Sequence, residues 1–457
     1  MTKKQFWLLL FAVFLTSLDL SIIGPALNTV GALWTVSERT LSWGVSIYSL
    51  MSLVGIPLLA RTSDLLGRRL VLISAMVIFV IGSVVVAQAP GFEWLLVGRA
   101  VQGFGAGGIT PVVVALIGDT MPRERQAPAL GMIGAMLGLG FIVGPALGGI
   151  LLHFSWRLLF LINLPLGAVV VAAMARGLPT GKPAGGIRMD WPGLVLLTAS
   201  FGLLALGINR LDIRNLAASF ASITVWPLFA ANLVLLPLFY ANERRASHPI
   251  INPGLLRMRR IIVTNLMSFG AGLGLISIQF IPRMAKLAFG ANDANASLML
   301  VPAAVTFVVA SFVVGSLLKK IGPLRVLAIF GILFTAGLVV FAANLDHLWA
   351  FYAGTILLSF GLAGVTGPSL RYIINMETAN QERGAAQALL LNVQLIGQLT
   401  GAALIGAFAA SWGGGLRGYS IIFLLLAGEA LVMTVLTAAL KRSAPVAAVA
   451  APVAAQG

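Results

Sequence analysis

Runs of about twenty apolar residues recur along the whole chain, and they constrain its fold more than any other feature. An α-helix of this length spans the hydrocarbon core of a bilayer. The residues are 59% hydrophobic and only 10% charged, whereas soluble domains carry about 25% charged residues. An ordinary water-soluble enzyme is therefore excluded, and the chain is predicted to be an all-α polytopic membrane protein.

The apolar runs predict fourteen transmembrane helices, an even number that places both termini on the same side of the membrane. The predicted spans are 6–28, 41–60, 70–89, 94–117, 127–152, 158–175, 191–208, 220–240, 261–287, 298–318, 324–343, 348–372, 384–410 and 418–440. The start of the chain resembles a signal peptide, but its apolar run reaches Asn28 without a convincing cleavage site. We therefore expect it to remain as the first helix.

The formal net charge of +16 raises the question of nucleic-acid binding. With Lys3 and Lys4 placed inside, most of the 30 basic residues fall in loops on that side, while Arg99 lies within a span. This distribution is the positive-inside bias of membrane proteins. The charge therefore indicates topology, with both termini in the cytoplasm, and nucleic acid is not expected as a partner.

Resident metals and catalytic groups are not expected either. The chain has no cysteine and three histidines, which excludes a disulfide framework and thiolate metal sites and argues against a histidine metal cluster. His153, His248 and His347 all lie away from the middle of the spans, and no nucleophile–base set accompanies them. A phosphate-binding G-x-x-x-x-G-K-S/T loop is absent, so the chain has no ATPase site of its own. We expect neither an enzyme nor a cofactor.

An internal duplication organises the chain. Equivalent positions in the two halves are separated by 255 to 258 residues: Gly67 and Gly322, Arg125 and Arg383, Gly140 and Gly397, Gly144 and Gly401. Chance matches in a glycine-rich chain would not share one offset. Two parallel halves that enclose a cargo site are a recurring transporter plan. The predicted units are a six-helix bundle at 1–176, a linker with two additional helices at 177–260, a second six-helix bundle at 261–442 and a disordered tail at 443–457.

Three sequence motifs stand out, two within predicted spans and one in the loop between the second and third spans. Residues 98–106 (GRAVQGFGA) contain R-x-x-Q-G-x-G, and residues 140–149 (GFIVGPALGG) match G-x-x-x-G-P-x-x-G-G at every fixed position. Residues 61–69 (RTSDLLGRR) resemble the loop motif G-x-L-A-D-R-x-G-R-R, with Ala60 in place of the first glycine and Leu65 in place of the first basic residue. Together these motifs resemble those of the major facilitator superfamily, in which the second is known as the antiporter motif.

Other segments resemble one branch of that superfamily. Residues 18–23 (LDLSII), 156–167 and 190–193 (DWPG) are similar to signatures of the fourteen-helix drug:proton antiporters, which also carry two inserted helices. The resemblance implies the major facilitator fold, with two six-helix bundles in parallel repeat plus two inserted helices. It also implies a monomer in the bacterial inner membrane that exchanges protons for amphiphilic small molecules.

Asp19 and Arg99 are the first candidates for a functional site. Ionised groups inside the bilayer are costly and are functional by default. They lie ~13 Å and ~8 Å from the outer ends of their spans, close enough in depth to form a pair. Arg99 would stabilise the Asp19 carboxylate, and separation would favour its protonation. The resemblance implies proton coupling at both positions, and the alternative is a permanent structural ion pair. Glu429, ~16 Å inside the last span, is either an accessory proton site or a protonated structural group.

Two sets of residues are candidates for a conformational switch. Gly140, Gly144 and Gly148 form one smooth helix face beside the hinge residue Pro145, and the resemblance implies that this face seals the two halves. Dense packing alone would use the same residues. Asp64, Gly67 and Arg68 could latch one half to the other, or could belong to a solvated loop that enforces topology. Lys319 occupies the position of Asp64 in the second half, so any latch is asymmetric.

The cargo site is less well marked. Polar residues in otherwise apolar spans are candidate cavity groups, although many such residues only join helices. They are Trp43, Tyr48, Gln102, Asn265, Gln279, Asn392, Gln394 and Gln398. Asp19 and Glu429 are the two intramembrane acids, so the predicted cavity offers few negative charges to bind a dicationic drug. Arg283 and Lys286 could instead attract an anionic or lipid-like head group.

Three functions remain open. The first is a proton-coupled exporter of amphiphilic compounds. The second is a proton-coupled importer or transporter of a metabolite, a lipid-linked compound or an anionic amphiphile. The third is a sensor or lipid scramblase on a transporter scaffold. The antiporter-like fifth span and the sparsely charged lining favour the exporter over a polar-metabolite importer.

Overall fold

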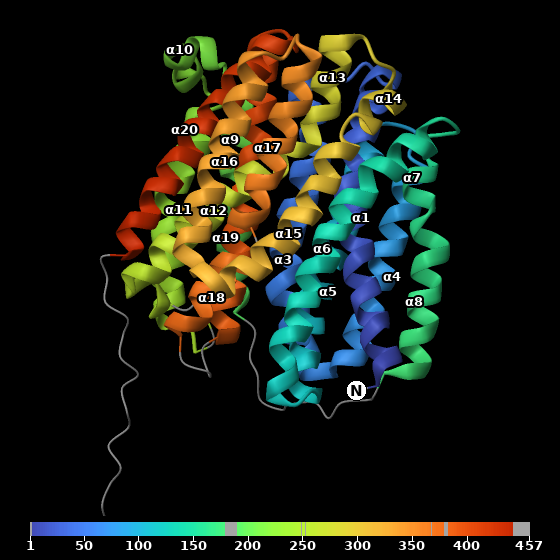
Figure 1. Ribbon diagram of the computed structural model, residues 1–457, viewed down its shortest axis with the longest axis vertical. Coiled ribbons are helices and arrows are strands. Elements are labelled where there is room, and N and C mark those ends of the chain that lie inside the picture. The colour runs from blue at the N-terminus through green and yellow to red at the C-terminus, as the bar shows by residue number, and fades with distance from the viewer. Residues whose placement is uncertain are drawn as a thin grey trace, which may run out of the picture.

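The structure is a computed structural model that describes residues 2–178, 190–247, 249–251, 253–366, 368–378 and 383–441, apart from some side chains within the helices. Helices form nearly all of this part of the chain, and it contains no strand. The long helices stand side by side as parallel rods, with the N-terminus at one end (Figure 1). We call this end the N side and the opposite end the far side.

The first half of the chain forms one bundle, the N bundle. Its helices are α1 (Lys3–Leu33), α2 (Glu38–Leu41), α3 (Trp43–Leu66), α4 (Arg68–Ala87), α5 (Phe92–Thr120), α6 (Arg123–Leu152), α7 (Leu158–Leu161) and α8 (Asn163–Gly177). α1 begins with a capping box in which Thr2 and Gln5 satisfy each other's backbone amides. Gly67 separates α3 from α4 with φ of 94°, a conformation that favours glycine.

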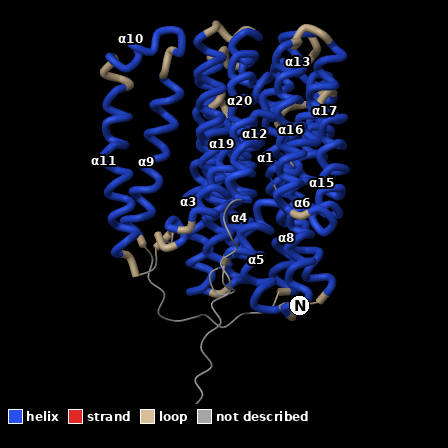
Figure 2. Tube along the Cα trace, turned by 60° about the vertical axis from the view of Figure 1, so that its left-hand side comes forward, coloured by secondary structure: helices blue, strands red, loops and turns tan. Residues whose placement is uncertain are grey.

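Two helices follow that belong to neither repeat. They are α9 (Trp191–Arg210) and α11 (Trp226–Arg245), joined by η1 (Ile213–Asn215) and α10 (Leu216–Ala221). Figure 2 shows α9 and α11 as a pair at the edge of the molecule. The predicted span 220–240 is corrected here, because α10 ends at Ala221 and the segment containing it meets α11 at a bend of 77°. A hydropathy average cannot detect a bend between two apolar segments.

The second half forms the C bundle. Its elements are η2 (Leu255–Arg257), α12 (Arg259–Ser277), η3 (Ile278–Phe280), α13 (Ile281–Phe289), α14 (Asp293–Leu298), α15 (Val301–Ile321), α16 (Pro323–Ala343), α17 (Leu348–Thr366), α18 (Pro368–Glu377), α19 (Arg383–Ser411) and α20 (Leu416–Lys441). Gly322 separates α15 from α16 with φ of 80°, as Gly67 does in the equivalent turn. The 3₁₀ segment η3 interrupts the span that α12 and α13 form together, and such interruptions often mark hinges.

Twelve spans of the described chain are long and apolar enough to cross a membrane, and the bent segment with α11 makes a thirteenth. They confirm the all-helical membrane fold. The remaining predicted span, 127–152, falls in α6, a helix of 30 residues in which many side chains lie outside the described part. The count of fourteen spans therefore stays a prediction.

Glycines join the first and fifth long helices of each bundle. A Cβ on Gly140 of α6 would lie 2.6 Å from the Ser17 side chain of α1, and a Cβ on Gly397 of α19 would lie 2.1 Å from the Phe269 carbonyl oxygen of α12. Both distances are far below a normal contact, so each helix pair requires glycine at the crossing. The two residues are equivalent in the repeat, which explains why their spacing recurs in the sequence.

Candidate functional site

A buried ion pair lies in the N bundle between α1 and α5. Arg99 Nη1 donates to Asp19 Oδ2 at 2.8 Å, and both side chains are completely buried. Removing two such charges from water costs several kcal/mol each, and the cost is recovered only when further hydrogen bonds satisfy both groups. The remaining contacts of the pair therefore decide what it can do.

Two amides complete the surroundings of the Asp19 carboxylate. Gln102 Nε2 donates to Asp19 Oδ1 at 2.9 Å, and Asn163 Nδ2 donates to the same oxygen at 2.7 Å. Both amides also donate to Ser83 Oγ of α4, at 2.7 Å and 3.1 Å. Side chains from α5 and α8 thus bind one carboxylate of α1, and Ser83 of α4 orients both amides. We call Asp19, Ser83, Arg99, Gln102 and Asn163 the acid cluster.

The Arg99 guanidinium is held by α3 as well. Its Nε donates to the Gly44 carbonyl at 3.2 Å, its Nη1 also donates to Gln102 Oε1 at 3.1 Å, and its carbon lies 4.3 Å from the centre of the Tyr48 ring. A cation over an aromatic face gains up to about 2 kcal/mol when both are desolvated. Arg99 Nη2 has no partner among the described residues. The guanidinium is therefore held in a fixed position, although one of its nitrogens makes no hydrogen bond to the described residues.

This arrangement has a definite chemical property. Every donor around Asp19 stabilises its ionised form, while complete burial disfavours that form. A movement of α5 or α8 relative to α1 that removed donors would leave a buried charge unpaired, and the carboxylate would then take up a proton. The acid cluster can therefore couple proton binding to helix movement.

Asn163 was missed as a site residue by sequence reasoning. It belongs to the segment 156–167 that resembles a branch signature, which was the available signal. Nothing in the segment itself reveals that α8 brings its first residue against α1. Tyr48 and Gln102, predicted to line a cargo cavity, contact the ion pair.

The charged residues of the predicted latch lie together at the N side. Arg68 forms ion pairs with Asp64 and with Asp119 of α5, and also donates to Ser63. All of these partners belong to the N bundle. The structure thus places Asp64, Gly67 and Arg68 in one local network, and a latch to the C bundle stays a prediction.

The glycine face of α6 packs on α1. A Cβ on Gly144 would lie 1.7 Å from Ser21 Oγ, and that hydroxyl donates to the Gly140 carbonyl at 2.9 Å. Gly148 is buried, and the side chain of Pro145 lies outside the described part of the chain. Gly140 and Gly144 therefore sit at a contact within the N bundle.

The predicted cargo residues do not gather at one place. Trp43 donates from Nε1 to Asn209 Oδ1 of the inserted α9 at 3.1 Å. Asn265 donates to the Ile261 carbonyl of its own helix at 2.8 Å. Gln394 is partly buried on α19, where its carbonyl contacts α12. Four of the predicted cargo residues have a buried side-chain oxygen with no partner in the described part of the chain: Asn265, Gln279, Asn392 and Gln398.

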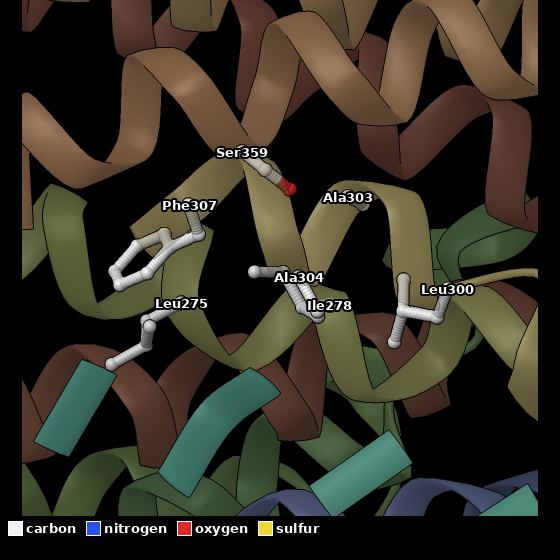
Figure 3. Close-up of a pocket in the computed structure, with 7 residues that line it drawn as sticks. All are labelled: Leu275, Ile278, Leu300, Ala303, Ala304, Phe307 and Ser359. Atoms are coloured by element: carbon white, nitrogen blue, oxygen red, sulfur yellow. The ribbon is translucent and has the colours of Figure 1, made fainter. Parts of the chain in front are cut away.

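The cavity drawn in Figure 3 is too small for a cargo molecule. It lies in the C bundle, has a volume of about 10 Å³ and is lined by α12, η3, α15, the residue Leu300 just before α15, and α17. This is room for about one water molecule. Ser359 supplies the one polar side chain, and the other lining residues, including Phe307 and Leu275, are apolar.

Polar contacts join the two bundles at the far side. Glu38 of α2 forms an ion pair with Arg283 of α13 and accepts a hydrogen bond from Tyr419 of α20 at 2.9 Å. Asp293 of α14 pairs with Lys286 at 2.7 Å and accepts from Thr29 of α1 at 2.8 Å. We call the contacts of Glu38 and Asp293 the far-side clasp. Because Arg283 and Lys286 are paired with acids, neither offers a free charge to an anionic head group here.

Comparison with known proteins gives the same family as the fold. The family model for the Major Facilitator Superfamily matches residues 9–283 and 262–456. The chain is 30% identical over 418 residues to the MFS-type transporter YfiU of Bacillus subtilis, covering 89% of this chain and 80% of YfiU. It is 29% identical to the multidrug transporter protein MdtP of the same organism (87% and 74% covered) and 30% identical to the drug efflux pump JefA of Mycobacterium tuberculosis (88% and 79% covered).

Solved structures show the same architecture. The human organic anion transporter MFSD10 (TETRAN) superposes with a TM-score of 0.66 over 96% of this chain and 100% of that one, at 17% identity. This likeness concerns the fold alone. Together with the two repeated bundles and the match to the family model, it leads to one conclusion: the chain belongs to the major facilitator superfamily of membrane transporters.

Proposed function

We propose that this protein is a proton-coupled antiporter that exports amphiphilic small molecules, and that it belongs to the fourteen-helix drug:proton branch of the superfamily. The N side then faces the cytoplasm. The observation that carries the proposal is the acid cluster, in which a buried carboxylate of α1 depends on donors from two other helices, α5 and α8. The names of the relatives MdtP and JefA support export of drug-like compounds.

The proposed cycle uses the acid cluster as the site of exchange. In the conformation with the far-side clasp closed, Asp19 is ionised because Arg99, Gln102 and Asn163 donate to it. Opening of the far side shifts α1, which carries both Asp19 and Thr29 of the clasp, and withdraws donors from the carboxylate. A proton from outside then neutralises Asp19, and its release on return to the first conformation drives export of the cargo.

The test is transport in liposomes with a pH gradient. Tetraphenylphosphonium and a fluorescent fatty acid, a lipophilic cation and an anionic amphiphile, are the two probes, preceded by a thermal-shift screen of both. We expect accumulation of one probe against its gradient, and we expect Asp19→Asn to abolish the dependence on the pH gradient. Glu93→Gln, which removes an exposed acid at the start of α5, is the matched control and should transport normally.

Transport at full rate by Asp19→Asn under the same pH gradient would contradict the proposal. So would transport by the unaltered protein without any counterflow of protons. In that case the ion pair would be a structural contact between α1 and α5.

A further inference from the structure

A second carboxyl group lies partly buried in the C bundle, outside the acid cluster. Glu429 of α20 borders a cavity of about 10 Å³. Residues of α12, α16, α17 and α20 line it, among them Gly270, Leu327, Val365 and Thr434. Its Oε1 atom is fully buried and has no hydrogen-bond partner among the described residues. Thr434 is the one other lining residue with a polar side chain, and its hydroxyl donates to the Ala430 carbonyl at 2.8 Å.

Among the described residues, no charged side chain lines the cavity beside this group. The charged residues of the helices packed on α20 lie toward the helix ends, and none lines the cavity: Arg259 and Arg260 on α12, Arg283 and Lys286 on α13, Arg325 on α16, and Arg383 on α19. An ionised carboxylate without donors or cations in apolar surroundings is prohibitively costly. We therefore expect Glu429 to hold a proton in this conformation, whereas the Asp19 carboxyl group is paired with Arg99.

The neighbouring helices are shaped to receive the acid. A Cβ on Gly270 of α12 would lie 1.8 Å from Glu429 Oε1, so the carboxyl group occupies space that glycine leaves free. The far end of the same span contacts the N bundle, because a Cβ on Gly24 of α1 would lie 2.5 Å from the Gln279 carbonyl oxygen in η3. A shift of α12 against α1 therefore also changes the walls around Glu429.

We propose that Glu429 is a second proton-binding site, whose proton exchanges with water as α12 moves. The cavity lies toward the N side, since Leu327 and Val365 in its wall are close to the N-side ends of α16 and α17. When α12 moves, the small cavity enlarges, water reaches the carboxyl group, and the proton leaves to the N side. Use of this proton in transport rests on the proposed function, whereas its presence and its exchange do not.

Infrared spectroscopy of the protein in lipid tests both steps without any substrate. At neutral pH we expect a carbonyl stretch of a protonated carboxylic acid that shifts on transfer to D₂O and is lost in Glu429→Gln. Glu429→Met is the second variant and should lose the same band. Asp19→Asn is the control and should keep the band, because Asp19 is ionised in this conformation.

Three results would overturn the inference. The first is absence of the band from the unaltered protein. The second is a band that disappears in Asp19→Asn and persists in Glu429→Gln. The third is a band that does not shift during prolonged exposure to D₂O. The last result would make Glu429 a permanently sealed structural acid. If the unaltered protein shows the expected infrared band but no proton-coupled transport in liposomes, the result would count against the proposed function and not against this inference.

Discussion

The oxygen Oδ1 of Asp19 receives both amides of the acid cluster, while Oδ2 receives the guanidinium. Each donor comes from a helix other than α1, so the ionisation of one residue reports the positions of several elements. A hydrogen bond to a charged group contributes about 1.5–3 kcal/mol. Loss of a single donor is therefore enough to change proton affinity by a measurable amount.

Asn163→Ala tests this dependence at the scale of one residue. The variant removes the 2.7 Å hydrogen bond to Asp19 and retains Arg99 and Gln102. With one donor fewer the ionised form is less stable, so protonation occurs at higher pH. We expect the midpoint of pH-driven transport to move upward by about one unit, since one unit corresponds to about 1.4 kcal/mol.

The measurement is the rate of probe transport in liposomes as a function of the pH on the N side, where the proposed cycle releases the proton. Asn344→Ala is the control, because the Asn344 side chain donates to the Val340 carbonyl of the preceding turn, far from the acid cluster in sequence and at the end of another helix. An unchanged midpoint in Asn163→Ala, with normal expression, would show that Asn163 only packs α8 against α1.

The helices show what hydropathy can and cannot predict. The spans were predictable because a helix that crosses a bilayer must be apolar over about twenty residues. The break at η3 and the bend after α10 were not, since both sides of each are apolar. The pairing of Asp19 with Arg99 followed from similar depths, whereas the contact of Asn163 depends on the packing of α8 against α1 and α4. Contacts between helices are a property of tertiary packing that one helix sequence does not contain.

The element α13 gives a prediction about the far side. It follows the break at η3 and carries Arg283, whose ion pair with Glu38 is mostly buried. Arg283→Gln should weaken the clasp by at least about 1 kcal/mol, the upper value for solvent-exposed ion pairs. A weaker clasp should let α13 swing at η3 and expose Gln279, which is only 3% accessible.

The chain has no cysteine, so one introduced cysteine reports this opening without background. We expect a maleimide reagent to modify Gln279→Cys several-fold faster when Arg283→Gln is also present. Arg157→Gln is the control, since Arg157 is exposed and its ring contact, with Trp156, stays within the N bundle. Equal labelling rates in the two backgrounds would mean that the Arg283–Glu38 pair does not hold the far side closed.

At the scale of the whole molecule, the inserted helix α9 joins the two bundles. α9 packs against α3 and α19, and buried apolar residues from α9 and α19 form a common cluster: Ala205, Ile208, Leu399 and Ala403. Asn209 bonds to Trp43, to Ser42 Oγ at 2.9 Å and to the Arg39 carbonyl at 3.0 Å. Beyond the end of α9, the Ile213 amide donates to Ser411 Oγ of α19 at 2.9 Å. α9 therefore touches both bundles on one seam.

Asn209→Leu tests this role. The variant removes three hydrogen bonds and leaves the Trp43 indole unpaired, at a cost of about 1–3 kcal/mol. We expect a lower midpoint of thermal unfolding in detergent. Asn232→Leu is the matched control, because Asn232 is similarly buried on α11 and bonds to the Leu228 carbonyl of its own helix. Equal losses of stability in the two variants would argue that the seam contact is dispensable.

The position of α8 has a consequence for the medium around the protein. One face of this helix carries Asn163, which is 1% accessible, and another carries Val169, which is 64% accessible and therefore meets lipid tails. α8 therefore contacts the Asp19 carboxylate on one face and the acyl chains of the lipids on another. A bilayer whose thickness changes the tilt of α8 would move the Asn163 amide relative to the Asp19 carboxylate, so we expect the acyl-chain length of the lipids to alter the proposed proton binding.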